Sequence, residues 1–357
     1  MGSRARRAHS TGRSAFPVLI AQFMDRTLDL IIIGAGPSGL AAAVAAGKAG
    51  LHYAVVEKGA LVNSIFHFPR NMVFFTTPEL LEIGGLPFTT PYEKPTRWEA
   101  LRYYRRVVDT YQIPVVFDEE VLSIKAGKMD AHGSRGFEIV TRLLSGIQRA
   151  HESRFVLLAS GYYDHPNLLG VPGEELPHVS HYYSEPHGYY RKRVVVVGGK
   201  NSAAIAALEL FRGGSAVALV HRRDRLSDSI KYWIRPDIDN RIKEGSIRAL
   251  FETRVVRIQP GSVVADTRGR LEELPADAVF LMTGYHPDAR LMLQAGIRMS
   301  EDTMAPEHDS GTLETNVSGL FVAGSIVSGR DTNRTFIENG RFHGEAVVKA
   351  VLARMQK

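Results

Sequence analysis

Two short runs of apolar residues are each followed at once by glycines and then by an alanine-rich stretch. The first run is Leu-Asp-Leu-Ile-Ile-Ile at 28–33, and the second is Val-Val-Val-Val at 194–197. A short β-branched run bounded by turn residues is typical of a buried parallel strand. The stretches that follow, which end near Gly47 and Arg212, have the composition of helices. The pattern therefore predicts two strand–turn–helix units in one chain.

The first turn reads Gly34-Ala-Gly-Pro-Ser-Gly39 and has the glycine spacing of a dinucleotide-binding turn. In such a turn the first glycine permits the bend, the second lets the backbone approach a pyrophosphate, and the third lets helix and strand pack closely. The helix N-terminus then presents N–H groups and a positive dipole to the phosphates. Glu57 ends the next apolar strand, eighteen residues after this turn, where an acid accepts hydrogen bonds from a ribose diol. We expect a dinucleotide here rather than a simple turn between packed elements.

The second turn, Gly198-Gly-Lys-Asn-Ser-Ala203, repeats this geometry with two changes. Lys200 replaces the second glycine, so a cation can meet a phosphate directly. Eighteen residues after the turn, the place of the acid is taken by His221, and Arg222 and Arg223 follow. A carboxylate there would repel a 2′-phosphate, whereas guanidinium groups can bind it in a bidentate way. The second ligand is predicted to be NADPH rather than NADH, and the alternative is a solvated basic loop.

The order of the two units predicts which cofactor each one holds. The acid-bearing unit is expected to bind FAD and the basic unit NADPH, so hydride passes from nicotinamide to flavin. Two similar loops, ASGYYD and MTGYHPD, bracket the second unit. We therefore expect an α/β fold of two Rossmann-like domains, with an NADPH domain at 176–290 inserted into a discontinuous FAD domain at 25–175 and 291–357. Residues 1–24 are expected to form a disordered leader.

Composition narrows the class of protein. With 44% hydrophobic residues among 357, the chain can build two cores, and no apolar run approaches the roughly 18 residues of a membrane span. We expect a soluble, cytoplasmic protein that does not act on membranes. The chain contains no cysteine, which excludes disulfides, thiolate metal sites and a cysteine nucleophile.

The net charge of +6 is concentrated at the N-terminus. Arg4, Arg6, Arg7 and Arg13 precede Met24 with no acid among them, and +6 minus these four leaves +2. We therefore expect no nucleic-acid partner. An Arg- and Ser-rich, acid-poor leader also has the composition of a transit peptide, but the sequence from Met24 begins as a compact domain would, which favours a disordered extension or an upstream start codon.

Two further segments carry weaker signals. Helical periodicity over 96–111 places Trp98, Leu101, Tyr104 and Val108 on one predicted apolar face. The His- and Tyr-rich segment 178–190 has no acid at a ligand spacing, so no metal site is expected.

The C-terminal segment is expected to reach the flavin. GLFVAGSIVSG at 319–329 reads as a strand and a turn, and a helix is predicted to follow, starting near NRTFIENGRFHGEAVVKAVL. A helix N-terminus aimed at the flavin pyrimidine stabilises the negative charge that gathers there on reduction. Thr335, Phe336 and Ile337 are the residues expected against the ring.

Taken together, these motifs resemble those of thioredoxin-reductase-like flavoproteins, from about Asp25 to the C-terminus. VEKGALVNSI, FFTTPELLEIGGLPF, GGKNSA and FIENGRFHG resemble the YpdA branch, the bacillithiol-disulfide reductases. The resemblance implies a homodimer whose two domains rotate to bring nicotinamide to flavin. It implies FAD contacts at Gly34, Gly36, Gly39, Glu57, Lys58, Asn63, Gly161 and Gly324, and NADPH contacts at Lys200, Asn201, Ser202, Arg222 and Arg223. The remaining expected cofactor contacts are Pro37, Ser38, Ser64, Ser160, Gly198, Ala203, His221, Thr283, Gly284, Tyr285 and Ser325.

The chain departs from that family at three places. The C-x-x-C of thioredoxin reductase falls on His181-Tyr-Tyr-Ser184, a cysteine in the first turn of the YpdA branch is Ser38, and an FAD-binding Asp is Ser325. Serine forms no reducible bond to sulfur, so reduced flavin itself must act on any disulfide. Ser38, His181 and Tyr182 are the candidate catalytic residues at the flavin edge, and the alternative for each is loop packing.

Three functions remain open from the sequence. The first is an NADPH- and FAD-dependent reductase of a small disulfide such as bacillithiol disulfide. The second is a ferredoxin- or flavodoxin-NADP reductase, which also needs no dithiol and passes single electrons to a carrier protein. The third is a flavin- and NADP-binding redox sensor read by a partner.

Overall fold

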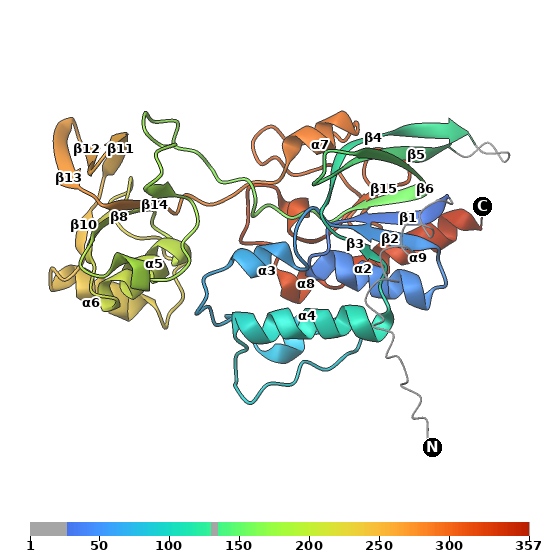
Figure 1. Ribbon diagram of the computed structural model, residues 1–357, viewed down its shortest axis with the longest axis horizontal. Helices are drawn as coiled ribbons and strands as arrows, with labels where there is room; N and C mark the ends of the chain where they lie inside the picture. The colour runs from blue at the N-terminus through green and yellow to red at the C-terminus, as the bar shows by residue number, and fades with distance from the viewer. Residues whose placement is uncertain (1–26, 130–134, 357) are drawn as a thin grey trace, which may run out of the picture.

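The computed structural model describes residues 27–129 and 135–356, so the expected leader at 1–24 lies outside the described residues. The chain forms two lobes (Figure 1). The first lobe is built on a seven-stranded sheet and the second on a five-stranded sheet. An additional three-stranded sheet belongs to the second lobe.

The sheet of the first lobe has the strand order β3-β2-β1-β6-β5-β4, and β15 also pairs with β6. Its parallel strands are β1 (Leu28–Ile33), β2 (Tyr53–Val56), β3 (Val115–Val116), β6 (Gln148–Leu158) and β15 (Leu320–Val322). Antiparallel β4 (Glu119–Met129) and β5 (Arg135–Leu143) extend it. Buried aliphatic residues fill β1 and β2 on both faces, as parallel strands require.

Helices cover this sheet, and α2 is the most central of them. The helices are α2 (Pro37–Lys48), α3 (Asn63–His67), α4 (Arg97–Tyr111), α7 (Ala289–Gln294), α8 (Ile337–Gly340) and α9 (His343–Met355), with short 3₁₀ turns η1 (Pro78–Leu81) and η3 (Gly324–Ser328). Helix α9 packs on α2 so closely that a methyl group on Gly344 would lie 2.4 Å from the Ala42 nitrogen. This contact buries the alanine face of α2 in the core.

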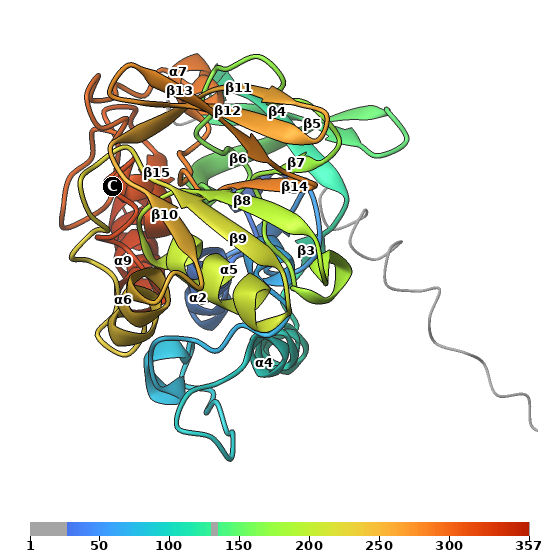
Figure 2. The ribbon, with the colours of Figure 1, turned by 90° about the vertical axis from the view of Figure 1, so that its left-hand side faces the viewer.

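The second lobe has an all-parallel sheet in the order β10-β9-β8-β14-β7. Its strands are β7 (Val179–Ser180), β8 (Arg193–Val197), β9 (Ala216–Val220), β10 (Arg248–Leu250) and β14 (Ala278–Leu281). Helices α5 (Asn201–Arg212) and α6 (Arg235–Lys243) cover one face, and β11 (Thr253–Gln259), β12 (Ser262–Thr267) and β13 (Arg270–Pro275) cover the other (Figure 2). A 3₁₀ turn, η2 (His187–Tyr189), precedes β8. Alternate β8 residues therefore enter two cores: Val194 and Val196 face the helices, and Val195 and Val197 face the small sheet.

The predicted strand–turn–helix units are confirmed by β1 with α2 and by β8 with α5, and so is the α/β fold of two Rossmann-like units. The predicted amphipathic helix is confirmed as α4, and Leu101, Tyr104 and Val108 of its predicted face pack on the core, but Trp98 does not. Trp98 is 59% exposed, whereas Ala100, Tyr103, Tyr104 and Val107 are buried. The tyrosines point inward because their hydroxyls donate to carbonyl groups of the 81–86 loop, which covers this side of the helix.

The predicted C-terminal helix is present, but it is broken into two helices, α8 and α9. Each approaches the first lobe's core through a glycine. Gly340 lies against Ser38 and Gly324, and Gly344 lies against Ala42. The break at Arg341 and Phe342 allows both approaches.

Two chain segments join the lobes and run antiparallel to each other. The Pro166–Tyr285 bridge pairs them, the Asn167 N–H donates to Gly284 O at 2.9 Å, and the His286 N–H donates to His165 O at 2.9 Å. The Thr283 hydroxyl adds a bond of 2.6 Å to Asn167 O. Thr283, Gly284 and Tyr285 thus belong to this connecting ribbon.

Candidate dinucleotide sites

The three glycines of the first turn have different surroundings. A methyl group on Gly34 would lie 2.5 Å from Ala159 O, and one on Gly39 would lie 2.0 Å from Gly34 O. A methyl group on Gly36 would meet no atom within 4 Å. The first and third glycines therefore serve the fold, while the second leaves open space beside the N-terminus of α2. This arrangement fits a pyrophosphate, which needs close approach to backbone N–H groups.

Glu57 is buried at the end of β2 and is bonded to the turn. Its carboxylate accepts hydrogen bonds from the Ala35 N–H at 2.8 Å and the Gly59 N–H at 2.9 Å. Burial raises the pKa of Glu57, and these two bonds oppose the rise. Each oxygen keeps a second lone pair for a ligand hydroxyl.

The residues after Glu57 shape the adjoining loop. The Lys58 ammonium pairs with Asp164 at 2.8 Å, which links β2 to the connecting ribbon. The Asn63 side chain accepts from the Ala60 N–H at 3.2 Å and closes the bend before α3, where Ser64 is half-buried. The side chains of Lys58 and Asn63 are thus bonded to other residues of the same chain.

The C-terminal strand and helices meet the N-terminus of α2. The Ser38 hydroxyl fills the space between two glycines, because a methyl group on Gly324 would lie 2.6 Å from Ser38 Oγ and one on Gly340 would lie 3.0 Å from it. Gly324 has φ +75°, and its N–H donates to His343 Nδ1 at 3.1 Å. Burial lowers the pKa of His343, in keeping with a neutral ring that accepts at Nδ1.

The expected ring contacts lie beside this junction. Thr335 is buried and its hydroxyl bonds to the Ser328 hydroxyl at 2.5 Å, Phe336 is exposed, and Ile337 opens α8. The Ser325 hydroxyl lies across from Gly161, 3.8 Å from where a methyl group on that glycine would be, and Ser160 is exposed.

In the second turn, as in the first, the first glycine is needed for close packing. A methyl group on Gly198 would lie 2.6 Å from Met282 O and 2.9 Å from the Ala203 methyl group, so both positions need small residues. The His221 ring packs flat on the next glycine, where a methyl group on Gly199 would lie 2.3 Å from the ring. Burial lowers the pKa of His221, and Arg223 and Arg222 lower it further.

Three cations near the second turn are exposed and have no acid within 4.0 Å in the part of the chain that the structure describes: Lys200, Arg222 and Arg223. By contrast, Arg225 pairs with Asp228 at 3.1 Å. Unpaired cations around a helix N-terminus fit a ligand with several phosphates. Lys200 stands at the N-cap of α5, and its side chain makes no capping hydrogen bond to the helix.

The Asn201 side chain forms hydrogen bonds to a neighbouring loop. Its Nδ2 donates to Ser229 O at 3.1 Å, and its Oδ1 accepts from the Lys231 N–H at 2.9 Å. The Ser227 N–H donates to Gly199 O at 2.9 Å. The segment 227–231 is therefore attached to the turn at three points, while Ser202 is exposed.

His181 lies at the carboxyl edge of the second sheet. Strands β7, β14 and β8 are parallel neighbours, so His181 follows β7 beside the end of β14, about two strand spacings or roughly 10 Å from the second turn. Its Nε2 is 3.4 Å from the Glu174 carboxylate, which also accepts from the Leu169 and Gly170 N–H groups. Burial lowers the pKa of His181, and Glu174 opposes this.

Tyr182 belongs to a cluster of rings at the connecting ribbon. Its hydroxyl donates to Tyr163 O at 2.9 Å, and the Tyr285 hydroxyl donates to His181 O at 2.9 Å. The Tyr285 ring lies 5.6 Å from that of Tyr182 and 4.6 Å from that of Tyr163. Burial raises the pKa of Tyr163 to about 12.

The three candidate catalytic residues do not form one cluster. Ser38 lies in the first lobe under α8, whereas His181 and Tyr182 lie in the second lobe beside the ribbon. Glu174 and Asp164 were missed from the sequence, because neither stands at a recognisable spacing from its partner. Within residues 27–129 and 135–356, no group of three or more His, Asp or Glu side chains could hold a metal ion.

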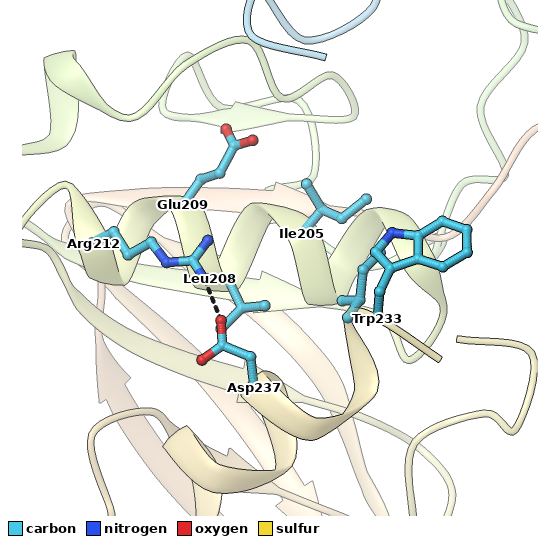
Figure 3. A pocket seen from close by; sticks show the side chains of 7 residues that line it. Ile205, Leu208, Glu209, Arg212, Trp233 and Asp237 are labelled. Atoms are coloured by element: carbon cyan, nitrogen blue, oxygen red, sulfur yellow. Dashed lines mark hydrogen bonds and ion pairs between the residues drawn. The ribbon is translucent and has the colours of Figure 1, made fainter. Parts of the chain in front are cut away.

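No helix in the described part of the chain is long and apolar enough to cross a membrane. A pocket of about 200 Å³ lies between α5 and α6 (Figure 3). Its lining residues are Ile205, Leu208, Glu209, Arg212, Trp233, Ile234 and Asp237.

Comparison with known proteins gives consistent matches over most of the chain. Residues 31–324 match the model of the pyridine nucleotide-disulphide oxidoreductase family. Bacilliredoxin reductase Bdr of Bacillus subtilis strain 168 is 41% identical over 325 residues, 91% of this chain and 97% of that protein. The structure of bacillithiol disulfide reductase Bdr (YpdA) from Bacillus cereus is 40% identical with a TM-score of 0.88, covering 92% of this chain and 100% of that one. A ferredoxin–NADP reductase of Ignicoccus hospitalis is 26% identical over 308 residues, 84% of this chain and 90% of that protein.

Proposed function

The chain belongs to the pyridine nucleotide-disulphide oxidoreductase family, a family of flavin-dependent oxidoreductases, and on that basis we propose that it passes electrons from NADPH through FAD to a small disulfide such as bacillithiol disulfide. The net reaction converts NADPH, a proton and one disulfide into NADP⁺ and two thiols. Relatives about 40% identical are named bacillithiol disulfide reductase and bacilliredoxin reductase. We further propose an NADPH domain at 176–290 within an FAD domain at 25–175 and 291–357.

The observation that carries this proposal is the difference between the two turns. The first has an open glycine and a buried acid, and the second has three exposed, unpaired cations. An acid suits the unphosphorylated ribose of FAD, and cations suit the additional phosphate of NADPH. When bound, NADPH supplies hydride and FAD accepts and releases two electrons.

The chain's own residues would hold and orient these groups. The N-terminus of α2 and the space at Gly36 would receive the FAD pyrophosphate, and Glu57 its ribose. Lys200 would bind NADPH phosphate, and Arg222 and Arg223 the 2′-phosphate. Ser38, His181 and Tyr182 remain our candidates for the flavin edge.

The absence of cysteine limits how a disulfide can react. A mixed disulfide with the protein needs a thiolate, and the sequence has none. The chain must therefore bind the disulfide and exclude water without forming a covalent bond to it. The His181 imidazole, 3.4 Å from the Glu174 carboxylate, is our candidate for transferring the one proton that the net reaction takes up.

Turnover with defined acceptors tests the proposal. Purified protein loaded with FAD should oxidise NADPH slowly alone and faster with bacillithiol disulfide, with two thiols released per NADPH. If bacillithiol disulfide and the disulfide form of bacilliredoxin both fail to accelerate NADPH oxidation, the proposal is wrong.

A ferredoxin- or flavodoxin-NADP reductase is the second candidate. The similarity to a ferredoxin–NADP reductase and the lack of any dithiol favour it. It predicts rapid reduction of ferredoxin by NADPH, which salt slows if the docking surfaces are charged. We also expect a cytoplasmic homodimer, and sedimentation of the full chain tests the dimer.

A further inference from the structure

His343 is the first residue of α9 and is bonded to η3, the turn that begins at Gly324. The Gly324 N–H donates to His343 Nδ1 at 3.1 Å, and Gly324 has φ +75°, in the left-handed region that favours glycine. A neutral imidazole has one ring nitrogen that accepts and one that donates. Because Nδ1 accepts this bond, the neutral ring carries its proton on Nε2, and the bond to Gly324 uses the only ring nitrogen that can accept.

The η3 turn borders the N-terminus of α2. A methyl group on Gly324 would lie 2.6 Å from Ser38 Oγ, and one on Gly340 would lie 3.3 Å from the Gly324 Cα. Ser38 stands in the first turn of α2, just after the open site at Gly36. The bond from Gly324 to His343 therefore fixes a segment beside the proposed pyrophosphate site.

His343 itself has little freedom to move relative to α2. The next residue, Gly344, packs so closely on this helix that a methyl group there would lie 2.4 Å from the Ala42 nitrogen. The His343 ring thus joins η3 to a helix that is already fixed on α2. Loss of the Gly324 bond would let η3 shift while α9 stays in place.

A proton on Nδ1 removes this bond. The charged imidazolium has an N–H at both ring nitrogens and no acceptor, so two N–H groups would face each other and the Gly324 N–H would lose its partner. Burial lowers the pKa of His343, and the nearby His308 lowers it further. The neutral ring is therefore the form that the fold favours at neutral pH.

The charged groups around the His343 ring come from few elements. The first turn of α2 and η3 have no titratable side chain, and Glu345 of α9 is exposed. On α8, Arg341 donates to two carbonyl groups at η1, and Glu338 lies near a buried tyrosine of α4. His308 is therefore the neighbouring charge that an experiment must control for.

We propose that His343 is a positioning residue for FAD: its neutral ring holds η3 against the N-terminus of α2, and a proton on Nδ1 is incompatible with the bound cofactor. This inference rests on the proposed function, because it requires FAD at the first glycine turn. By linkage, FAD that binds to protein with a protonated His343 must release that proton, so acid weakens FAD binding. The charge of a nearby pyrophosphate alone would cause proton uptake instead, so the direction of proton transfer distinguishes the two effects.

Calorimetry of the FAD-free, full-length protein with FAD tests the linkage without any measurement of activity. The FAD affinity should be constant above pH 6.5, the ordinary pKa of histidine, and should fall by up to about tenfold per pH unit below the lowered pKa of His343. Titrations in two buffers of different ionisation enthalpy should show release of up to about one proton per FAD in acid, and no release at pH 8. Proton uptake in acid, or no proton transfer there, would overturn the inference.

Two amide variants separate the acceptor from the size of the side chain. His343→Asn places a carbonyl oxygen near the position of Nδ1 and does not titrate, so it should bind FAD within about threefold of the wild type at pH 8 and keep that affinity in acid. His343→Gln places its amide near the position of Nε2 and leaves the Gly324 N–H unpaired, so FAD affinity should fall about 5- to 100-fold at every pH.

His308→Asn is the matched control, because it removes the neighbouring titratable ring and keeps His343. This variant should still lose FAD affinity in acid, with the midpoint moved to higher pH, since the charge that lowers the pKa of His343 is gone. Thermal unfolding without FAD shows whether each variant is folded. If His343→Gln does not fold, the pH profiles of the wild type and His343→Asn still decide.

The outcomes distinguish this inference from the proposed function. If the wild type and His343→Asn bind FAD with the same pH dependence, the inference is wrong and the proposed function stands. If the wild type binds no FAD at any pH, both are wrong.

Discussion

The carboxylate of Glu57 accepts a hydrogen bond from the Ala35 N–H at 2.8 Å, across 22 residues of sequence. This bond joins the end of β2 to the middle of the first glycine turn. The acid expected from its spacing therefore has a role before any ribose arrives: it fixes the turn. A buried carboxylate bonded to backbone N–H groups is a stable anchor for such a loop.

Gly39 and Gly36 have different surroundings, so we expect substitution of Gly39 to lower stability and substitution of Gly36 to weaken FAD binding. Gly39→Ala should lower the free energy of unfolding by about 1–3 kcal/mol, because the new methyl group meets Gly34 O. Gly36→Ala should change it by less than about 0.5 kcal/mol, because the site is open and φ is −75°. FAD affinity should fall at least about tenfold in Gly36→Ala, where a methyl group occupies the pyrophosphate's place.

Thermal unfolding of the flavin-free proteins and FAD titration measure these two effects. Equal loss of stability in both variants, or full FAD binding by Gly36→Ala, would contradict the assignment of the turn.

The exposed Arg222 and Arg223 predict that the protein prefers NADPH to NADH. Replacing Arg222 and Arg223 by glutamine should weaken NADPH binding about 10- to 100-fold, because charge-assisted bonds to the 2′-phosphate are lost. NADH binding should change little. Arg225→Gln is the matched control, since Arg225 already pairs with Asp228. Titration with both nucleotides measures the ratio, and equal losses for NADH and NADPH would refute a 2′-phosphate site.

Glu174 lies beside His181, so we expect its replacement to change the pH at which His181 titrates. Burial lowers the pKa of His181 and the neighbouring carboxylate raises it, so Glu174→Gln should move the titration to lower pH. The His181 ring signals in NMR follow this directly. Glu175→Gln, at an exposed neighbour, should leave the midpoint in place. An unchanged midpoint in Glu174→Gln would show that the 3.4 Å contact has no electrostatic role.

The buried carboxylate of Glu119 predicts that the first lobe loses stability in acid. Burial alone would raise the pKa of Glu119, but bonds from His151, at 2.9 Å, and Thr141 outweigh it and lower the pKa. A lowered pKa in the folded state means that ionised Glu119 stabilises the protein above its unfolded pKa, near 4.5. This stabilisation is lost as the pH falls through the folded value.

Glu119→Gln should therefore lose about 1.5–3 kcal/mol at pH 7, because the hydrogen bonds from His151 and Thr141 lose their charged acceptor, and should flatten the fall in stability below pH 4.5. Denaturant unfolding at several pH values measures both. Glu120→Gln, at an exposed pair with Arg142, is the control and should lose less than about 1 kcal/mol.

The sequence predicted the elements with strong local signals. The runs at β1 and β8, their glycine turns and the alanine-rich helices are local patterns, so short windows were enough. Trp98 was wrongly placed on the buried face of α4 because it is apolar, whereas the loop that binds Tyr103 and Tyr104 covers a different part of the helix surface.

Other features depend on distant partners that no spacing reveals. The antiparallel pair β4 and β5 and the small sheet β11–β13 carry no motif, and they were not predicted. The approach of Phe75 to Trp233 joins residues far apart in sequence, and only the packing of the two lobes brings it about. Lys200, Arg222 and Arg223 were found because a turn and a fixed spacing located them.

Anaerobic reduction of the bound flavin by NADPH tests the central claim most directly. The account predicts a yellow protein whose visible flavin absorbance is bleached by one equivalent of NADPH and restored by one equivalent of bacillithiol disulfide. Ferredoxin as the only effective oxidant would favour the second candidate. A protein that stays colourless with excess FAD, or a bound flavin that NADPH does not bleach, would contradict the account.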